Sequence, residues 1–304
     1  MEGHLRYKDK VTVITGGSSG IGKGCATVFV QQGSKVVFCS YNEKEGKEAE
    51  RELNDIGPGE ALFIFADVTK EDDIKNLINK AVERYGKIDC VINNAGQHPE
   101  YRTIDNYTAE EFRKLFEVNV LGYFLVSKYA LPHLRKTEGN IINNSSMTAH
   151  TAAGWCSVYC ATKYKSHSDL SLTFFSSDAN TSNLQDSRKK GAVSAMTRAL
   201  AIDEAKYNVR VNSFSGGNID TPLSNQFINS TANPDETGQI FSNISLLGRR
   251  GTAEECGMTS LYLASDATFS TGIDIHVSGG AELNYACKNV NTKEFWPNSF
   301  LKKQ

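Results

Sequence analysis

Short apolar runs alternate with helix-prone stretches along most of this chain, and this alternation restricts its fold more than any other feature. The runs expected to form strands are 10–15, 35–39, 61–66, 88–92, 140–143, 209–213 and 272–277. Segments with helical spacing of apolar residues lie between them, among them 20–32, 43–53, 71–85 and 112–134. Strands that alternate with helices of this length indicate βαβ units and a parallel sheet covered on both faces. We therefore predict an α/β fold, with a doubly wound parallel sheet of seven strands and helices on both of its faces, in a single domain.

The composition is that of a globular protein, with 39% hydrophobic residues and a net charge of −2. This charge balance gives no indication of nucleic-acid binding or of an acidic membrane surface as partner. No apolar run approaches the ~20 residues that a membrane-spanning helix needs. The polar start at Met1–Tyr7 lacks the apolar core of a secretory signal. We expect a cytoplasmic protein.

The seven cysteines are scattered along the chain and include no C-x-x-C pair. No Cys/His spacing is typical of a zinc site, so we expect no metal. Cys156 and Cys160 would share a helix face, where we interpret them as small packing residues.

A glycine-rich stretch follows the first expected strand and opens the first expected helix. It contains Gly16, Gly20 and Gly22. Glycines in this context permit a tight turn and let the backbone approach a pyrophosphate at the helix N-terminus. The pattern therefore predicts a Rossmann-type dinucleotide site, although a plain Gly/Ser loop would show the same residues.

Polar residues also follow the later strands, at the sheet edge where parallel folds bind ligands. Asp67 ends the third strand and could accept a hydrogen bond from an adenine amino group, or simply form a turn. Asn93–Gly96 ends the fourth strand and resembles an ordinary Asn/Gly turn when taken alone. Ser145 and Ser146 end the fifth strand.

Tyr159 and Lys163 are four residues apart, so on a helix they would share one face. With the Tyr and Lys content of this chain, about one such pair is expected by chance. Its position matters more, because Tyr159 follows Ser146 by thirteen residues.

Taken together, these motifs resemble the short-chain dehydrogenase/reductase family over about residues 8–287, apart from 164–190. The stretches that carry the resemblance, in the family's order, are Thr15–Gly22, Asn93–Gly96, Asn119, Ser146 and Tyr159–Lys163. The resemblance implies a Rossmann dehydrogenase domain at 5–287, interrupted at 164–190, and a tail at 288–304. It also implies hydride transfer between a secondary alcohol or ketone and NAD(P). The chain is most similar to members that oxidise steroid 17β-hydroxyls and L-fucose with NAD.

The resemblance assigns four catalytic roles. Tyr159 would exchange a proton with the substrate oxygen. Lys163 would lower the pKa of the Tyr159 phenol and hold the nicotinamide ribose. Ser146 would hydrogen-bond the substrate oxygen. Asn119 would hold a water that links Lys163 to solvent, or make a plain structural hydrogen bond.

The resemblance also places a set of residues around cofactor and substrate. The cofactor set is Gly16, Ser19, Gly20, Ile21, Gly22, Ser40, Asp67, Val68, Asn94, Ala95, Gly96, Tyr159, Lys163, Ile219 and Thr221. His98 and Tyr285 would contact substrate, although His98 could equally be a loop histidine without a role. An apolar wall would suit a steroid better than a sugar; its members would be Met147, Trp155, Leu223 and Phe227.

Two departures from the family pattern affect the cofactor site. Ser40 stands where an acidic residue would select NAD, and a hydroxyl does not repel a 2′-phosphate as a carboxylate does. No Arg replaces it, so we expect NAD and leave NADP open. The proline usual after the sixth strand is absent, and Ser215–Gly217 would form a looser turn.

A third departure is the 27-residue insertion 164–190, directly after Lys163. A continuous helix of 27 residues would advance ~40 Å and turn its second half the wrong way, so the insertion must loop out. Its origin could be a retained intron or an alternative splice product, and a lid or partner-binding loop is the functional alternative. Two hypotheses follow: an active dehydrogenase with an extruded loop, or a catalytically impaired splice-type variant that binds dinucleotide or only oligomerises. We expect a homo-oligomer, a dimer or a tetramer, because family members pair through long helices.

Overall fold

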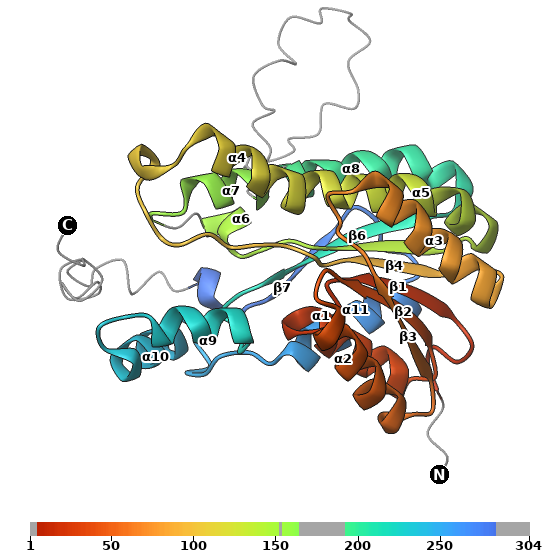
Figure 1. Cartoon of the computed structure of the whole chain (residues 1–304), viewed down its shortest axis with the longest axis horizontal. Coiled ribbons are helices and arrows are strands. Elements are labelled where there is room, and N and C mark those ends of the chain that lie inside the picture. The colour runs from red at the N-terminus through yellow and green to blue at the C-terminus, as the bar shows by residue number, and fades with distance from the viewer. Residues whose placement is uncertain (1–4, 152–153, 164–191, 284–304) are drawn as a thin grey trace, which may run out of the picture.

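The computed structural model describes residues 5–151, 154–163 and 192–283. It contains a seven-stranded parallel sheet with the order β3-β2-β1-β4-β5-β6-β7 (Figure 1). The strands are β1 (Val11–Thr15), β2 (Lys35–Ser40), β3 (Glu60–Phe65), β4 (Cys90–Asn93), β5 (Asn140–Asn144), β6 (Arg210–Gly216) and β7 (Asp274–Val277). The predicted doubly wound Rossmann-type sheet is thereby confirmed. The insertion 164–190, Ala153, Tyr285 and the tail 288–304 lie outside the described residues.

Helices cover both faces of this sheet, as Figure 1 shows. One face carries α1 (Gly20–Gln31), α2 (Glu43–Ile56) and α11 (Ala253–Ser265). The other face carries α3 (Glu71–Tyr85), α5 (Gly122–Thr137) and α8 (Ala192–Glu204). Each layer buries its own apolar cluster against the sheet, so the central strands are buried on both faces, whereas the edge strands β3 and β7 are mostly half-buried.

Strand β2 contributes side chains to the apolar clusters on both faces of the sheet. Val36 and Phe38 belong to the cluster under α1 and α11. Val37 and Cys39 belong to the cluster under α3 and α5. Successive side chains of a strand point to opposite faces, so a strand buried on both sides reads as an unbroken apolar run. This is why the strands were visible in the sequence.

The segment expected as one helix over 112–134 is longer and is interrupted. It consists of α4 (Ala109–Phe116), a π-helical turn η2 (Glu117–Leu121) and α5. The start lies before Phe112 because Thr108 and Glu111 form a capping box, which satisfies the free N–H groups of the first turn. Single π-turns inside helices are frequent at functional sites, and this one holds Asn119.

The remaining short elements gather beyond the carboxyl ends of the strands, on the left of Figure 1. They are α6 (Thr148–Thr151), α7 (Ser157–Lys163), α9 (Pro222–Asn229) and α10 (Pro234–Asn243). Three 3-10 turns complete the described chain, at Ile104–Asn106, Ala205–Tyr207 and Ala281–Leu283. Among the described residues, no helix is long and apolar enough to span a bilayer.

The expected loose turn at Ser215–Gly217 is wrong. Ser215 and Gly216 belong to β6, and Gly217 donates its backbone N–H to the carbonyl oxygen of Val277 at 3.0 Å. Pairing with β7 therefore extends the strand to Gly216, and the hydrogen bond from Gly217 holds the next residue against β7. A side chain at Gly217 would press against Ser278, whose Cα would lie 2.9 Å from the added Cβ.

Candidate active site

The glycine loop between β1 and α1 is shaped by a close backbone contact. Gly16 has a φ of +65°, in the region that favours glycine. A Cβ added at Gly22 would lie 2.1 Å from the carbonyl oxygen of Gly16. Asn94 fixes the loop from β4, because its side-chain N–H donates to the carbonyl oxygens of Thr15 at 3.0 Å and Gly16 at 3.2 Å. The turn thus requires glycine, as predicted.

The N-terminus of α1 has the character of an anion site. Ser19 precedes the helix, and its side chain accepts no capping hydrogen bond from the first turn among the described residues. That first turn also carries no acidic side chain. Free N–H groups at a helix N-terminus favour a phosphate group. The residues here therefore fit the pyrophosphate of a dinucleotide.

Thr221 closes over the same loop from the other side. It is the N-cap of α9, and a Cβ added at Gly20 would lie 3.6 Å from the Thr221 Cβ atom. Ile219 is buried and packs in the cluster that also contacts Ile21. The structure thus brings the segment after β6 beside the glycine loop, where the resemblance places the nicotinamide end of the cofactor.

The expected adenosine side lies at the ends of β2 and β3. Ser40 is buried and pairs in register with Phe65, and its hydroxyl accepts from the backbone N–H of Asn42 at 3.1 Å. Asp67 accepts from the backbone N–H and the hydroxyl of Thr69, at 3.0 and 2.8 Å. One carboxylate oxygen of Asp67 therefore serves a local turn, and its adenine contact stays a prediction. Val68 is buried against Gly122.

Tyr159 on α7 faces the end of β5, where Ser146 lies. The two side chains are hydrogen-bonded to one another, and both are half-buried. Burial raises the pKa of the Tyr159 phenol to about 12, and the hydrogen bond with Ser146 lowers it only in part. The predicted pairing of a phenol and a hydroxyl at the strand ends is therefore present.

Lys163 lies one turn further along α7, and its ammonium group is directed into the fold. It donates to the carbonyl oxygen of Asn144 at 2.8 Å and to the Tyr123 hydroxyl at 3.2 Å. Its nitrogen also lies 4.6 Å from the Tyr123 ring centre. Burial lowers the pKa of Lys163 to about 7. We expected Lys163 to lower the pKa of Tyr159, but burial is the largest influence on the pKa of both groups.

Asn119 joins the loop after β4 to the catalytic helix. Its side-chain oxygen accepts from the backbone N–H of Gln97 at 2.8 Å, and its amide nitrogen donates to the Gln97 carbonyl oxygen at 3.0 Å. The same amide lies 3.3 Å from the Thr162 hydroxyl. Asn119 thus contacts the neighbour of Lys163, which is consistent with the structural alternative; the water-holding role stays a prediction.

A chain of aromatic rings leads away from Tyr159 towards α9 and α10. The His98 ring centre lies 4.3 Å from that of Tyr159 and 4.8 Å from that of Tyr101. Tyr101 in turn lies 4.6 Å from Phe227, which lies 5.6 Å from Phe241. His98 therefore lies beside the Tyr159 phenol, and its predicted contact with substrate stays a prediction. Tyr101 and Phe241 had no sequence signal, because only the fold brings their segments together.

The segment that carries α9 and α10 is closed at its base. Ile219 forms a β-bridge with Gly251. The backbone N–H of Asp220 donates to the Gly251 carbonyl oxygen at 2.7 Å, and that of Gly251 donates to the Asn218 carbonyl oxygen at 2.9 Å. Arg250 adds hydrogen bonds to the Ile219 carbonyl oxygen and the Asn225 side chain, at 3.2 and 2.8 Å. We call these contacts the neck of the segment.

Known proteins match this chain over nearly its whole length. Residues 10–168 match the family described as short chain dehydrogenase. Residues 170–282 match the family described as enoyl-(acyl carrier protein) reductase. The chain belongs to the short-chain dehydrogenase family. It is thus an oxidoreductase that acts on CH–OH groups with NAD(P), and the glycine loop fits that cofactor.

Three relatives of this short-chain dehydrogenase are informative. L-fucose dehydrogenase of Bos taurus is 41% identical over 283 residues, which are 93% of each chain. The ligand-free aldohexose dehydrogenase of Thermoplasma acidophilum is 28% identical with a TM-score of 0.75, over 93% of this chain and 97% of that one. The 3-ketoacyl-(acyl-carrier-protein) reductase of Brucella melitensis in complex with NADH is 27% identical with a TM-score of 0.74, over 90% and 99%.

Proposed function

We propose that this short-chain dehydrogenase oxidises L-fucose, or a sugar closely similar to it, with NAD. The observation that carries the proposal is the 41% identity to a bovine L-fucose dehydrogenase over 93% of both chains. The fold similarity to an aldohexose dehydrogenase points to the same class of substrate. The reaction removes a hydride from a sugar CH–OH carbon and a proton from its hydroxyl group.

Tyr159 and Ser146 would act on the hydroxyl group of the substrate, from which a proton is removed. The nicotinamide, when bound, supplies the acceptor for the hydride. Tyr159 in its phenolate form would accept the proton of a sugar hydroxyl placed between the two side chains, while the Ser146 hydroxyl donates a hydrogen bond to the substrate oxygen. The hydrogen bond between Tyr159 and Ser146 supports this proposal, because it brings the two side chains together at the end of β5.

Lys163 would adjust the charge of this site. With a pKa of about 7, its amine changes protonation near neutral pH, so modest changes in its surroundings would shift its charge. A positive charge at this position favours the phenolate form of Tyr159. Asn119 acts as a positioning residue, because it fastens α7 to the loop that carries His98.

The cofactor preference for NAD rests on what surrounds Ser40. The hydroxyl of Ser40 is used by the backbone of Asn42, and the next side chain, Tyr41, is 74% exposed. Neither position supplies the guanidinium group that holds a 2′-phosphate in NADP enzymes. NADP remains the alternative to be measured.

A steroid hydroxyl is the second candidate substrate. It is favoured by the aromatic chain from His98 to Phe241, which offers a largely apolar wall beside Tyr159. An aromatic wall suits a flat apolar ligand such as a steroid. The same wall can also pack against the C–H face of a sugar ring. The wall therefore keeps a steroid as a candidate without excluding L-fucose.

The impaired-variant hypothesis is opposed by the contacts around Lys163. The buried ammonium group is satisfied by Asn144 and Tyr123, and α8 packs beside α7. A helix of seven residues is marginal alone, but tertiary contacts stabilise it here. We therefore favour the active dehydrogenase with an extruded loop.

An oxidation screen tests the proposal. Purified chain is assayed by NADH or NADPH fluorescence with NAD or NADP and with L-fucose, estradiol or simple secondary alcohols. We expect the highest kcat/KM with L-fucose and NAD. Turnover of estradiol but not of L-fucose would mean that the substrate is a steroid and not a sugar. If a fluorescence titration detects no NADH binding, this form of the chain is not an active dehydrogenase.

We also propose that the chain forms a homo-oligomer. The helices α4 and α5 and the turn η2 between them expose large apolar side chains, of which Phe112, Leu121 and Phe124 are 42%, 37% and 49% exposed. Apolar faces of this kind mark interaction surfaces. Light scattering coupled to size exclusion measures the mass, and Phe124→Glu should shift a dimer or tetramer to smaller species. A wild-type monomer would contradict the proposal.

A further inference from the structure

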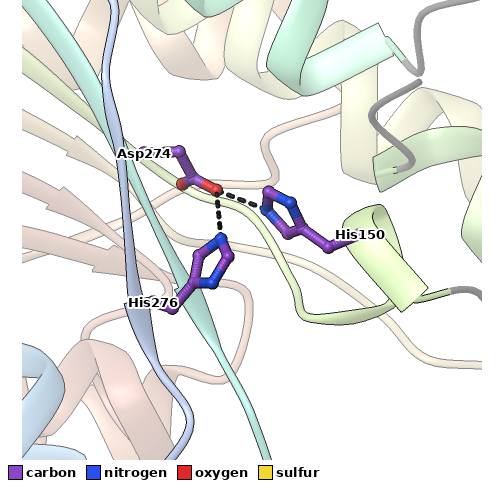
Figure 2. Close-up of side chains that lie close together, drawn as sticks. All are labelled: His150, Asp274 and His276. Carbon is purple, nitrogen blue, oxygen red and sulfur yellow. Dashed lines mark hydrogen bonds and ion pairs between the residues drawn. The ribbon is translucent and has the colours of Figure 1, made fainter. Parts of the chain in front are cut away.

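A cluster of two histidines and an aspartate lies behind the catalytic serine loop, apart from the Tyr159 site. His150 comes from α6, four residues after Ser146, whereas Asp274 and His276 come from the edge strand β7. Figure 2 shows both imidazole rings directed at the same oxygen of Asp274. One ligand atom from each residue lies within 4.8 Å of the other two.

We propose that His150, Asp274 and His276 form a binding site for one divalent transition-metal ion of the zinc class. The Oδ2 atom of Asp274 lies 2.5 Å from His150 Nε2 and 3.8 Å from His276 Nε2. Tetrahedral zinc with bonds of about 2.0–2.1 Å holds its ligand atoms about 3.3 Å apart. The two observed distances bracket this value, and the ligand nitrogens of the two histidines lie within 4.8 Å of each other, so modest shifts of the side chains would form the site. Two imidazoles and one carboxylate leave the fourth position to a water.

The surroundings of His276 orient it as a ligand. Its Nδ1 atom lies 3.0 Å from an oxygen of Glu282, whose other oxygen accepts from the Ser278 hydroxyl. A proton held on Nδ1 by this carboxylate leaves a lone pair on Nε2, which points towards Asp274. Metal-binding histidines show this arrangement, in which a second carboxylate fixes the tautomer. Glu282 is therefore assigned the outer position of the site.

Two serines orient the aspartate in the same way. Ser213 and Ser215 alternate along β6, so their side chains lie on one face and both reach Asp274. Ser213 donates to Oδ1 at 2.6 Å and Ser215 donates to Oδ2 at 2.8 Å. Burial raises the pKa of the Asp274 carboxyl, but the hydrogen bonds from His150, Ser213 and Ser215 hold it below its usual value. The two serines thus fix the orientation of the Asp274 carboxyl inside the fold.

The donor set selects the class of metal. Imidazole nitrogen with one carboxylate oxygen suits zinc, copper, nickel or iron, whereas calcium and magnesium prefer oxygen ligands alone. His150 and Asp274 are nearly fully buried and His276 is 28% exposed at its side chain. The ion would reach the site from the side of His276, at the edge of the sheet.

Such an ion would fasten the serine loop to the edge strand. His150 belongs to the turn that starts at Ser146, whose carbonyl oxygen accepts from Ala149 N–H at 2.9 Å. A bond between α6 and β7 through the metal would therefore restrict the loop that carries the catalytic hydroxyl. The role is structural, because the ligands lie behind the site and not at Tyr159.

The competing occupant of this site is a proton. A protonated His150 would form a buried ion pair with Asp274, and His276 would share its charge with Glu282. A proton and a metal ion would bind to the same side-chain atoms, so the affinity of the site for the metal decides which of the two occupies it.

The experiment uses the untagged full-length chain, stripped with EDTA and titrated with Zn²⁺ in competition with a chromophoric chelator. We expect one ion per chain in the wild type. His276→Leu, at the partly exposed ligand, should lower the affinity at least 100-fold, and Glu282→Gln should lower it 10- to 100-fold. If the leucine variant fails to fold, Asp274→Asn takes its place. It keeps the shape of the side chain and should also lose the ion.

His133→Ala is the matched control, because it removes a histidine on α5 outside the cluster. It should bind zinc like the wild type. Co²⁺ in place of Zn²⁺ should give visible d–d absorption without a thiolate-to-cobalt band, which separates this site from the cysteines. Equal zinc affinity in the wild type and His276→Leu, or a thiolate band that survives in that variant, would overturn the proposal.

Discussion

The Ser194 hydroxyl lies 3.4 Å from the backbone carbonyl oxygen of Lys163, although 31 positions separate the two residues in the chain. The helix α8 therefore starts beside the end of α7. Behind this contact, Thr197 on α8 accepts from Asn143 of β5 at 2.8 Å, and Asn143 accepts from Asn93 of β4 at 2.8 Å. Lys163 thus lies on a framework that is tied to the centre of the sheet.

We predict that deleting residues 164–190 changes kcat/KM for the preferred substrate by less than about threefold. The Lys163 side chain keeps its contacts with Asn144 and Tyr123, and α8 already lies beside α7. Closing a loop of this length costs only about 3 kcal/mol of chain entropy, so the deletion should raise the melting temperature. Steady-state kinetics and thermal denaturation of both forms measure this. A gain of more than about 100-fold on deletion would instead support the impaired-variant hypothesis.

Removing the phenol hydroxyl should abolish most turnover without harming the fold. We expect Tyr159→Phe to lower kcat 10²- to 10⁴-fold, because a positioned proton acceptor contributes about that factor. Ser146→Ala should lower kcat by a smaller factor, since Tyr159 remains. NADH affinity by fluorescence should change less than about threefold in both variants. Retention of more than a tenth of wild-type kcat in Tyr159→Phe would mean that another group exchanges the proton.

The buried amine of Lys163 should make stability depend on pH. Its pKa is lowered to about 7 in the folded chain from an ordinary value near 10.5. Between these values the unfolded chain binds the proton and the folded chain does not, so stability falls as the pH drops from about 10.5 to about 7. Lys163→Met removes this penalty. The unfolding free energy of Lys163→Met minus that of the wild type should therefore increase by about 3 kcal/mol as the pH is lowered from 9.5 to 6.5.

Urea denaturation at several pH values measures that difference. Lys136→Met, at an exposed position of α5, is the control and should show no such trend. An identical pH trend in the two variants would show that Lys163 is not the group responsible. Oxidation activity of Lys163→Met should be lost at every pH.

The glycine loop offers a test of the dinucleotide site. Gly22→Ala places a Cβ 2.1 Å from the Gly16 carbonyl oxygen, so the turn must open. We expect NADH affinity to fall at least tenfold, together with a loss of stability of a few kcal/mol. Gly238→Ala on α10 is the matched control, where the Cβ meets only a side-chain carbon at 4.0 Å. It should leave NADH affinity unchanged and stabilise its helix slightly. Normal NADH binding by Gly22→Ala would place the cofactor elsewhere.

The sheet could be predicted because its central strands are buried on both faces and so read as short apolar runs. All seven strands were located within a few residues, and the residues that follow them lie at one edge of the sheet. The glycine loop was also visible from its local spacing, and the resemblance to the family implied that Tyr159 and Ser146 lie together. The π-turn at Asn119 was not, because a single extra residue in a helix leaves no clear period.

Features that depend on distant segments could not be read from the chain. His150 and Asp274 are 124 positions apart, so no Cys/His spacing could reveal their cluster. The turn at Ser215–Gly217 was misjudged because pairing with β7 determines it. The low pKa of Lys163 follows from burial, which the sequence does not report.

The neck at Ile219 and Gly251 has a consequence for how substrate preference can change. The 31 residues between these two positions leave and re-enter the domain at one hydrogen-bonded point, held also by Arg250. Their length can vary at little cost, since closure entropy grows slowly with loop size. The segment with α9 and α10 is thus an exchangeable module: grafting a relative's version between these two residues, with Thr221 retained beside the glycine loop, would replace the Phe227 and Phe241 part of the aromatic chain.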